Sequence, residues 1–536
     1  MAPAKRGIIF LRPTTLTKVD SAKERELDRA AARAHAASVS FRASEKFRKS
    51  KSKAQASTHP GILTQEEYTR FRYRTRKGDA SPLSHLLEGN SDPFDALPVN
   101  ITPRVNEALS FFRTHYLPAT YGRESLQARS SAEELEYQAF INCMHDECSA
   151  LAFVFLQTVN LSQVKSMSAS RKMSLDQHEL ALKTKSFAVL RERIGQKLAK
   201  ENEDRTILRS AILLYSSAVV RGDYIEATMH GKSLARMLYE REWESPTTAK
   251  EQAFVGHMIW TDAHFAQRFM KAPHLDATWA LAKLKPVMEP LDKMLSSLEG
   301  MFTAGMDECL DTEPVRSAFI RDRFAGWLWT IESLPKGVDS EAAGFWVIAT
   351  IHLVQGEMVS YALDVDERLR KCTTEGQCDD ATECVWLTQQ SIALGLVFAV
   401  WLFSAPSVGG YKIMWTGPVI LSRLRKSLSK AMTLAYTIGS RSDKPDPTAT
   451  SKYDNAYLWI LSKVAQSEHT FAKPNSNPWK GWGNRNFAAV AQRMQLTEWE
   501  TVHERLKKFL FHDGLEPRAS SWVERTIRLN ASDPSS

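Results

Sequence analysis

The stretch Ser91–Gly122, SDPFDALPVNITPRVNEALSFFRTHYLPATYG, separates two parts of the chain that differ in composition. Before it the chain is basic and poor in large apolar residues, and after it apolar residues recur at helical spacing almost to the end. Pro93 and Pro98 favour extended backbone, because a proline ring clashes with a helical preceding residue. Thr102 predicts a helix start, since it is a capping residue followed by a proline. Residues 81–100 are therefore expected to be an extended join.

The helix that follows the join is expected to bury one face and to end at Pro118. Its apolar residues recur at roughly helical spacing. They are Val105, Leu109, Phe112 and Leu117. This helix is the first element of a body that the composition predicts to be helical.

The charge of the chain is concentrated before the join. Residues 1–80 carry 19 Lys and Arg against 8 Asp and Glu, a net +11, whereas the whole chain of 536 residues carries +8. The remainder therefore carries −3. A basic arm on a near-neutral body is typical of a protein that contacts polyanions through the arm.

The arm, residues 1–80, is predicted to be largely disordered, with a short helix over 21–53 as the alternative for its basic part. A helix there would align basic side chains along one face that can contact phosphates. No leucine heptad follows to dimerise it. The competing interpretation is a solvated tail that carries a nuclear-import signal at Lys46–Lys53. The segment FRYRTRKG, which ends at Gly78, alternates arginines with aromatic residues, a pattern that can stack on bases or serve as a linker. The candidate nucleic-acid-binding residues are Arg25, Arg29, Arg33, Arg42, Lys46, Arg48, Lys49, Lys53, Arg72, Arg74 and Arg76.

The body, residues 101–530, is predicted to be all-α, a large bundle of helical hairpins with a solenoid-like course. A basic amphipathic helix is expected over 419–438, with a face that either meets acidic groups or nucleic acid, or is solvated. A polar linker is expected over 441–451 and a loop over 469–484. The other expected helices are 131–161, 174–200, 249–269, 277–284, 291–306, 315–331, 342–363, a buried one over 391–404, 457–467, and one capped by Thr497.

The clearest pair of helices lies in residues 207–240, where Gly222-Asp223 is the expected turn of an antiparallel hairpin of tetratricopeptide-like design. His230 lies on the return helix and is interpreted as a packing or hydrogen-bonding side chain, because no nucleophile or acid stands at an indicative spacing. The apolar positions expected on the return helix are Tyr224, Ala227, Met229, Leu234 and Leu238.

Three segments in order resemble one known family. SDPFDALPV precedes a helix and LPATYG, AVVRGDYIEATMHGKSLARML forms the hairpin, and WETVHERLKKFLF is followed by SSWVE near the C-terminus. Together they resemble the fungal-specific transcription factor regulatory domain of the "middle homology" type. The resemblance implies a nuclear regulator with an all-helical body. The family's usual six-cysteine zinc cluster is absent, because residues 1–142 contain no cysteine.

Cysteines and short motifs favour no metal, cofactor or enzyme. The six cysteines form no disulfide framework, and neither Cys143, His145 and Cys148 nor Cys372, Cys378 and Cys384 has the spacing of a structural zinc site. The residues between Arg368 and Thr388 are expected to form an acidic surface loop. We find no phosphate loop or catalytic signature. The longest apolar run, 392–405, is too short to cross a bilayer and predicts a buried helix.

The sequence therefore predicts a nuclear transcriptional regulator. Its partners are expected to be DNA through the arm, a nuclear import receptor, and regulatory proteins or a small effector bound by the helical body, with no membrane. The alternative is a helical scaffold or co-regulator that does not bind DNA. An enzyme on a helical scaffold is the third hypothesis, which a deep polar pocket with convergent titratable groups would favour.

Overall fold

The computed structural model describes residues 97–531 apart from gaps at 118–126, 164–168, 198–203, 240–248, 306–312, 332, 377, 405–406, 409–410, 413–415, 441–451, 471–476, 514–515 and 517–518. Contacts along the chain separate the unit Pro98–Ser536 from the residues before it. The expected arm, its short helix and all eleven candidate nucleic-acid-binding residues lie outside the described residues.

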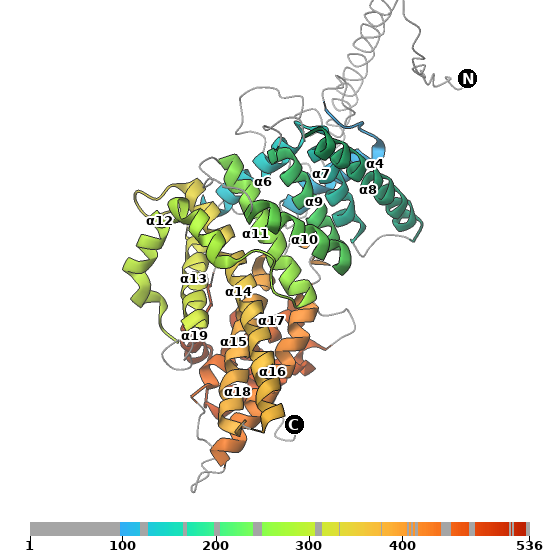
Figure 1. Ribbon diagram of the computed structural model, residues 1–536. Coiled ribbons are helices and arrows are strands. Elements are labelled where there is room, and N and C mark those ends of the chain that lie inside the picture. Colours follow the sequence, from blue (N-terminus) through green and yellow to red (C-terminus); the bar gives the residue numbers. More distant parts are fainter. Residues whose placement is uncertain are drawn as a thin grey trace, which may run out of the picture. The chain divides into compact units, whose positions relative to one another are not determined.

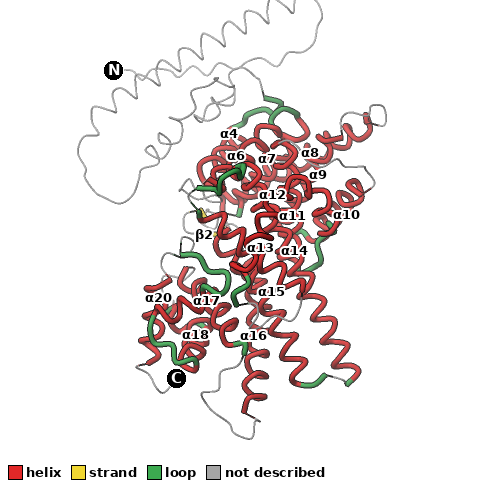
Figure 2. The backbone as a smooth tube through the Cα atoms, turned by 90° about the vertical axis from the view of Figure 1, so that its left-hand side faces the viewer, coloured by secondary structure: helices red, strands yellow, loops and turns green. Residues whose placement is uncertain are grey.

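The prediction of an all-α body is confirmed, because the described chain is a succession of helices interrupted by one pair of two-residue strands (Figures 1 and 2). The first elements are α4 (Pro103–Phe111), a π-helical turn (Phe112–Tyr116), α6 (Gln127–Cys143), α7 (Glu147–Ser162), α8 (Ala169–Lys197), α9 (Asp204–Arg221), α10 (Tyr224–Tyr239) and α11 (Ala249–Phe269). The middle is formed by α12 (Ala277–Phe302), α13 (Glu313–Thr330), α14 (Ser340–Glu375) and α15 (Asp380–Ser404).

The C-terminal elements are the antiparallel strands β1 (Ser407–Val408) and β2 (Tyr411–Lys412), then α16 (Thr416–Ser440), α17 (Asp454–Thr470), a 3₁₀ turn (Pro478–Lys480), α18 (Trp482–Arg493), α19 (Trp499–Leu506) and α20 (Ala519–Ala531). Of these, α16 and α17 pack against α15, and α18 and α19 pack against α17. Helix α14 packs against α11, α15, α6, α13 and α12, so it lies at the centre of the bundle. One hydrophobic core joins α6 to helices α11 to α20 around it, and a second core joins α9 and α10 to α11.

The start of α4 is as predicted. The Val105 amide donates to the Thr102 hydroxyl at 3.2 Å, and a proline occupies the first helical position. The four predicted apolar residues are all buried, and Phe112 is completely so. The Thr102 cap therefore directs a helix whose apolar side enters the core, as the local sequence indicates.

The hairpin of α9 and α10 is also confirmed. Gly222 adopts φ +78°, a left-handed conformation that glycine takes without steric cost, and the Asp223 carboxylate accepts from the Glu226 amide at 3.0 Å. Two of the five apolar residues that mark this helix lie outside the core, because Tyr224 is 43% exposed and Met229 is 66% exposed on the outer side of α10. The buried side of that helix includes Ala227, Leu234 and Leu238.

The single helix expected over 131–161 is wrong, since two helices are present. Helix α6 ends at Cys143, and the Asp146 carboxylate accepts from the Ser149 amide at 3.1 Å to start α7. A short acidic side chain is a strong N-cap, and this local bond competes with helix continuation. The expected helix over 174–200 begins earlier, at Ala169.

The interruption expected between the helices 277–284 and 291–306 is wrong, because α12 continues through Pro286 and Pro290. The two residues are one turn apart, and both side chains face solvent. Because proline has no N–H group, two backbone hydrogen bonds are missing from the helix. Both are missing on the same outer side, where water can satisfy the freed carbonyls. The inner side of α12 stays buried through Leu284, Met288 and Leu291.

The surface loop expected between Arg368 and Thr388 is also wrong. Helix α14 runs to Glu375 and ends at Gly376, which adopts φ +65°. The Asp379 carboxylate accepts from the Thr382 amide at 2.6 Å and starts α15. The expected loop is therefore a tight turn between two long antiparallel helices.

Helices α14 and α15 are each long and apolar enough to cross a membrane by length and composition. The most apolar window of each is 83% buried inside the bundle. This burial is what the central helices of a large core require. The predicted buried helix over 391–404 is thereby confirmed as the second half of α15.

Near the C-terminus, the expected 469–484 loop is shorter because α18 begins at Trp482. The Glu468 carboxylate of α17 accepts from the amides of Gly483 at 2.9 Å and Asn484 at 3.1 Å. This cap comes from another helix, so the local sequence does not reveal it. Helix α19 begins at Trp499 with Glu498 at its N-cap, so the predicted capping by Thr497 is wrong.

Arg323 on α13 fastens two distant parts of the chain. Its guanidinium donates to the carbonyls of Phe302 at 3.0 Å and Ala304 at 3.1 Å, just at the end of α12. It also donates to the carbonyls of Lys508 at 3.2 Å and Lys507 at 2.9 Å, just after α19. One side chain thus satisfies the carbonyl ends of two helices, which otherwise have no helical partner.

We expect Arg323→Ala to lower the free energy of unfolding by about 3 kcal/mol, because four carbonyl groups lose a charged donor. Urea denaturation of the full chain measures this through the shift of the midpoint. The matched control is Arg370→Ala, since Arg370 is exposed and bonds Glu367 on its own helix. Equal losses of unfolding free energy in the two variants would show that the bonds of Arg323 stabilise the protein no more than an exposed ion pair does.

Candidate functional site

A cavity of about 610 Å³ lies between α11 and α14. The connection from α11 to α12, residues 270–276, forms another part of its wall. On α14 the lining residues run from His352 to Arg368 along one face, which spans about 24 Å at 1.5 Å per residue. The cavity is therefore a trough, and its size is that of a small-molecule site.

Asp262 of α11 holds the connecting segment in place. Its carboxylate accepts from the Tyr215 hydroxyl at 2.7 Å and from the amides of His274 at 3.1 Å and Leu275 at 2.7 Å. Burial raises the pKa of Asp262 to about 6, although these three donors favour the ionised form. The side chain is thus a buried anchor that also lines the trough.

The same segment begins with a strained residue. Met270 adopts φ +48°, a left-handed conformation that costs a non-glycine residue about 1 kcal/mol. The amide of Lys271 donates to the carbonyl of Ala266 at 3.2 Å and closes the last turn of α11. The strain is tolerated because Asp262 binds the chain a few residues later.

His352 lies at the buried end of the trough and is 8% exposed. Its Nδ1 donates to the side-chain oxygen of Gln355 at 2.8 Å, so its Nε2 carries a lone pair. Burial lowers the pKa of His352 to about 4, and the ring is neutral at neutral pH. Behind it lies His264, with ring centroids 5.5 Å apart, whose Nδ1 donates to the Trp260 carbonyl at 2.7 Å.

Away from His352 the trough is lined mainly by acids. Asp276 accepts from the Trp279 amide at 2.7 Å and starts α12. Glu357 bonds Arg321 at 2.9 Å, and Asp364 is exposed one turn before Arg368. With Asp262, the trough is lined by four carboxyl groups and one guanidinium, a formal charge of −3.

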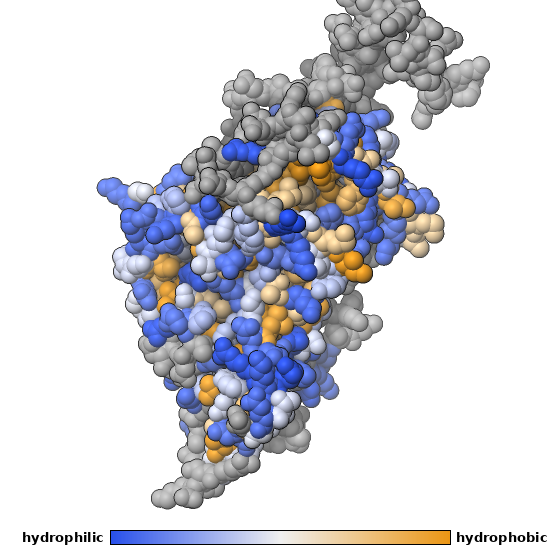
Figure 3. Space-filling view, viewed as in Figure 1, coloured by the Kyte–Doolittle hydropathy of each residue, from blue (hydrophilic) through white to orange (hydrophobic). Residues whose placement is uncertain are grey.

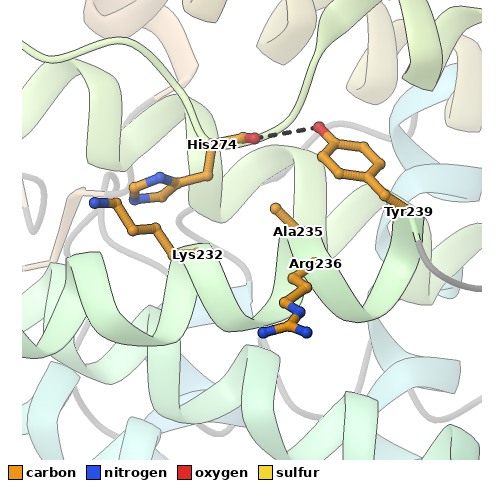
Figure 4. Close-up of a pocket in the computed structure, with 5 residues that line it drawn as sticks. All are labelled: Lys232, Ala235, Arg236, Tyr239 and His274. Atoms are coloured by element: carbon orange, nitrogen blue, oxygen red, sulfur yellow. Dashed lines mark hydrogen bonds between the residues drawn. The ribbon is translucent and has the colours of Figure 1, made fainter.

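A shallower hollow adjoins the trough on the α10 side and shares Tyr239 and His274 with it. The Tyr239 hydroxyl donates to the His274 carbonyl at 3.2 Å, while the side chain of Arg236 points away from both (Figure 4). Lys232 lies beside the His274 ring (Figure 4). A single lysine at an open surface makes this hollow a weaker candidate than the trough.

A hydrogen-bonded serine and histidine occur elsewhere in the body. The Ser216 hydroxyl lies 3.0 Å from Nε2 of His257, and it also bonds the Thr261 hydroxyl at 2.6 Å. The cavity that His257 lines measures about 20 Å³, and Ser216 is completely buried. No substrate fits there, so this pair is a packing network.

The basic face predicted on α16 is occupied by acids. Arg423 bonds Asp366, Arg425 bonds Glu468 at 2.9 Å, and Lys430 bonds Glu383. Those carboxylates lie on α14, α17 and α15. The face therefore meets acidic groups and ties α16 to its neighbours, while Lys426 and part of Lys430 remain exposed to solvent.

His230 on α10 packs as predicted. Its ring stacks on Phe187 of α8 with centroids 5.6 Å apart and lies 3.6 Å from the Glu226 carboxylate. Glu226 in turn bonds Lys183 of α8 at 2.5 Å. Beside this contact, Leu180, Ile225 and Met229 are 63% to 73% exposed, and apolar side chains are visible over this end of the molecule (Figure 3).

The cysteines do not converge on a metal site within the described ranges. Cys143 and Cys148 are buried while His145 points to solvent, and burial raises the pKa of Cys143 to about 12. Cys372 is on α14, and Cys384 is buried on α15. Cys143, Cys148 and Cys384 are thus core residues, whereas Cys372 and Cys378 are half-buried.

No family model, curated protein or solved structure matches this chain. The resemblance to the fungal regulatory domain therefore stays a prediction from the three quoted segments.

The trough residues are absent from the sequence-based candidates. One signal was present: Asp262 interrupts an apolar helical face in HMIWTDAHF, and His352 does so in VIATIHLVQ. A polar side chain on a buried helical face needs a partner or a cavity. The partner of Asp262 is a loop that follows in the sequence, but the opposite wall of the trough lies on α14, far along the chain.

We expect a pH-dependent stability difference between the protein and Asp262→Asn. An acid with a raised native pKa holds more protons in the folded state, so its contribution to stability falls as pH rises from about 4 to about 6. The free energy of unfolding of the protein, minus that of the variant, should fall by about 3 kcal/mol over this range. Urea denaturation at each pH measures it, and a flat or rising difference contradicts the assignment.

Proposed function

We propose that this protein is a nuclear transcriptional regulator of the fungal-specific type, whose helical body senses a partner or small effector and whose basic arm contacts DNA. The observation that carries the proposal is the division of charge, +11 on residues 1–80 against −3 on the rest. The basic helix α16 supports it, because three of its cations, Arg423, Arg425 and Lys430, are engaged with acids of neighbouring helices. The arm is therefore the part of the chain that we propose contacts a polyanion.

The proposed location is the nucleus. Lys46–Lys53 is a run of basic residues of the kind that import receptors bind. It lies in residues 1–80, which are poor in large apolar residues. The proposed protein partners would bind the body. The exposed side chains of Leu180, Ile225 and Met229 offer apolar contact area for that purpose.

We infer binding rather than catalysis in the trough. Its titratable groups converge, as the enzyme hypothesis requires, but their hydrogen bonds and ion pairs hold the structure together. Asp262 holds the connecting segment, Asp276 caps α12, and Glu357 pairs with Arg321. The neutral His352 bonds Gln355 on its own helix rather than a nucleophile. Such an arrangement recognises a ligand by fixed polar groups.

The competing function is a scaffold or co-regulator that does not touch DNA, in which the arm serves only import. The two functions differ in the nucleic-acid affinity of residues 1–80. A regulator that contacts phosphates through the arm must release counterions, so its affinity depends steeply on salt. A scaffold shows no such affinity.

We expect duplex DNA to bind the full chain with a slope of log affinity against log salt of about −4.5 or steeper, which corresponds to roughly five phosphate contacts. Fluorescence anisotropy across a salt series measures the slope. Replacing Arg25, Arg29 and Arg33 by alanine should make the slope shallower by about 2 to 3, because each lost contact removes about 0.9.

The matched control removes three cations from the body, with Arg423, Lys426 and Lys430 replaced by alanine. This variant should bind DNA as the unaltered protein does, since the first and last of these side chains pair with acids. No binding by the full chain at low salt would eliminate the DNA-contact function and leave the scaffold. An equal loss in both variants would assign the affinity to net charge alone.

A further inference from the structure

The trough offers hydrogen-bond acceptors in a row. Along α14 they are Nε2 of His352, the Glu357 carboxylate, the Ser360 hydroxyl and the Asp364 carboxylate. His352 and Asp364 are twelve residues apart, about 18 Å along the helix axis. Among the described residues, none bonds Nε2 of His352 or pairs with Asp364. The two ends of the row are therefore acceptors open to a ligand that donates.

Apolar surface separates these acceptors. Leu353 and Tyr361 of α14 line the trough, and Ile259 and Ala263 of α11 line it as well. Gly356 has no side chain and leaves space in the middle of this face, where an added Cβ would lie 3.4 Å from Cγ of Pro273. A ligand lying lengthwise thus meets polar and apolar stretches alternately.

The charge of the trough selects the sign of the ligand. Its lining carries a formal −3, since both lining histidines are neutral at neutral pH. A partly enclosed trough with apolar walls strengthens the attraction between charges compared with open water. A cation is therefore favoured, and an elongated one can reach more of the acceptors than a compact one.

We propose that the trough between α11 and α14 binds a linear aliphatic polyamine. Its ammonium groups donate to Asp364, to the Glu357 and Ser360 region and to His352, while its methylene segments cover Leu353 and Tyr361. This inference rests on the proposed function, for which it names the effector class. Each ammonium brings a charge and two or three donors. Nε2 of His352 and the Asp364 carboxylate are acceptors without a partner among the described residues, although the Arg368 guanidinium lines the trough one turn beyond Asp364.

The test is isothermal titration calorimetry of the full chain, without DNA, with spermidine as the probe. We expect one saturable site with a dissociation constant of about 0.5 mM at low salt, typical of several solvent-accessible ion pairs acting together. Putrescine, which is shorter and carries one charge fewer, should bind about tenfold more weakly. Hexaamminecobalt(III) has the charge of spermidine in a compact shape, and it should also bind more weakly.

Three variants locate the site. Asp364→Asn at one end and His352→Phe at the other should each weaken spermidine about threefold to fivefold and reduce its advantage over putrescine. Gly356→Leu should abolish binding by filling the middle of the trough. The matched control is Asp176→Asn, because Asp176 is exposed on α8, away from the trough. Circular dichroism establishes that each variant is folded.

Three outcomes overturn the proposal: no saturable spermidine binding up to about 10 mM, hexaamminecobalt(III) binding as tightly as spermidine, or unchanged spermidine binding in both Asp364→Asn and Gly356→Leu. The titration contains no nucleic acid, so it stands apart from the DNA measurement. Spermidine binding without DNA binding would contradict the proposed DNA-binding regulator and would support the polyamine site. DNA binding without spermidine binding does the reverse.

Discussion

The burial of α14 is the constraint on which the other elements depend. This helix of 36 residues is about 54 Å long, and five other helices pack around it. Trp346 is completely buried against Phe324 of α13, and its indole nitrogen donates to the Asp292 carboxylate of α12 at 3.0 Å. A helix that is apolar on nearly all sides must be enclosed to be stable in water. The enclosure also creates the trough, because α14 carries His352 and Asp364 on the one face that α11 and its following segment cover only in part.

Ionised side chains fasten the helices around this core through backbone groups. Arg323 caps the carbonyl ends of α12 and α19, whereas Glu468 caps the amide end of α18 and also bonds Arg425. Each charge lies where the dipole of the helix end has the opposite sign. The pair of Lys463 and Glu516 is different, because both side chains are buried. Desolvation lowers the pKa of Lys463 and raises that of Glu516, so their attraction offsets a cost that burial creates.

Local features of the sequence determined most of what could be predicted. The cap at Thr102, the turn at Gly222-Asp223 and the apolar faces of the helices depend on residues within a few positions, and these predictions are confirmed. The failures have a common cause in distant contacts. Pro286 and Pro290 are tolerated because α12 buries its opposite side, and α18 begins where a carboxylate from α17 reaches it. The trough was unpredictable for the same reason, since its walls come from distant segments, as with Asp262 and His352, which are ninety residues apart.

A ligand in the trough changes the body only if it binds two arrangements of the helices with different affinity. The connecting segment, residues 270–276, is where such a difference can arise. It begins at the strained Met270, and its amides depend on one carboxylate, Asp262, that also faces the trough. A cation near Asp262 stabilises the ionised carboxylate, which accepts hydrogen bonds from those amides more strongly than the protonated form does. Occupation of the trough therefore favours the arrangement in which the segment is held against α11. The segment ends at Asp276, which is the N-cap residue of α12, so its position also determines where that helix starts.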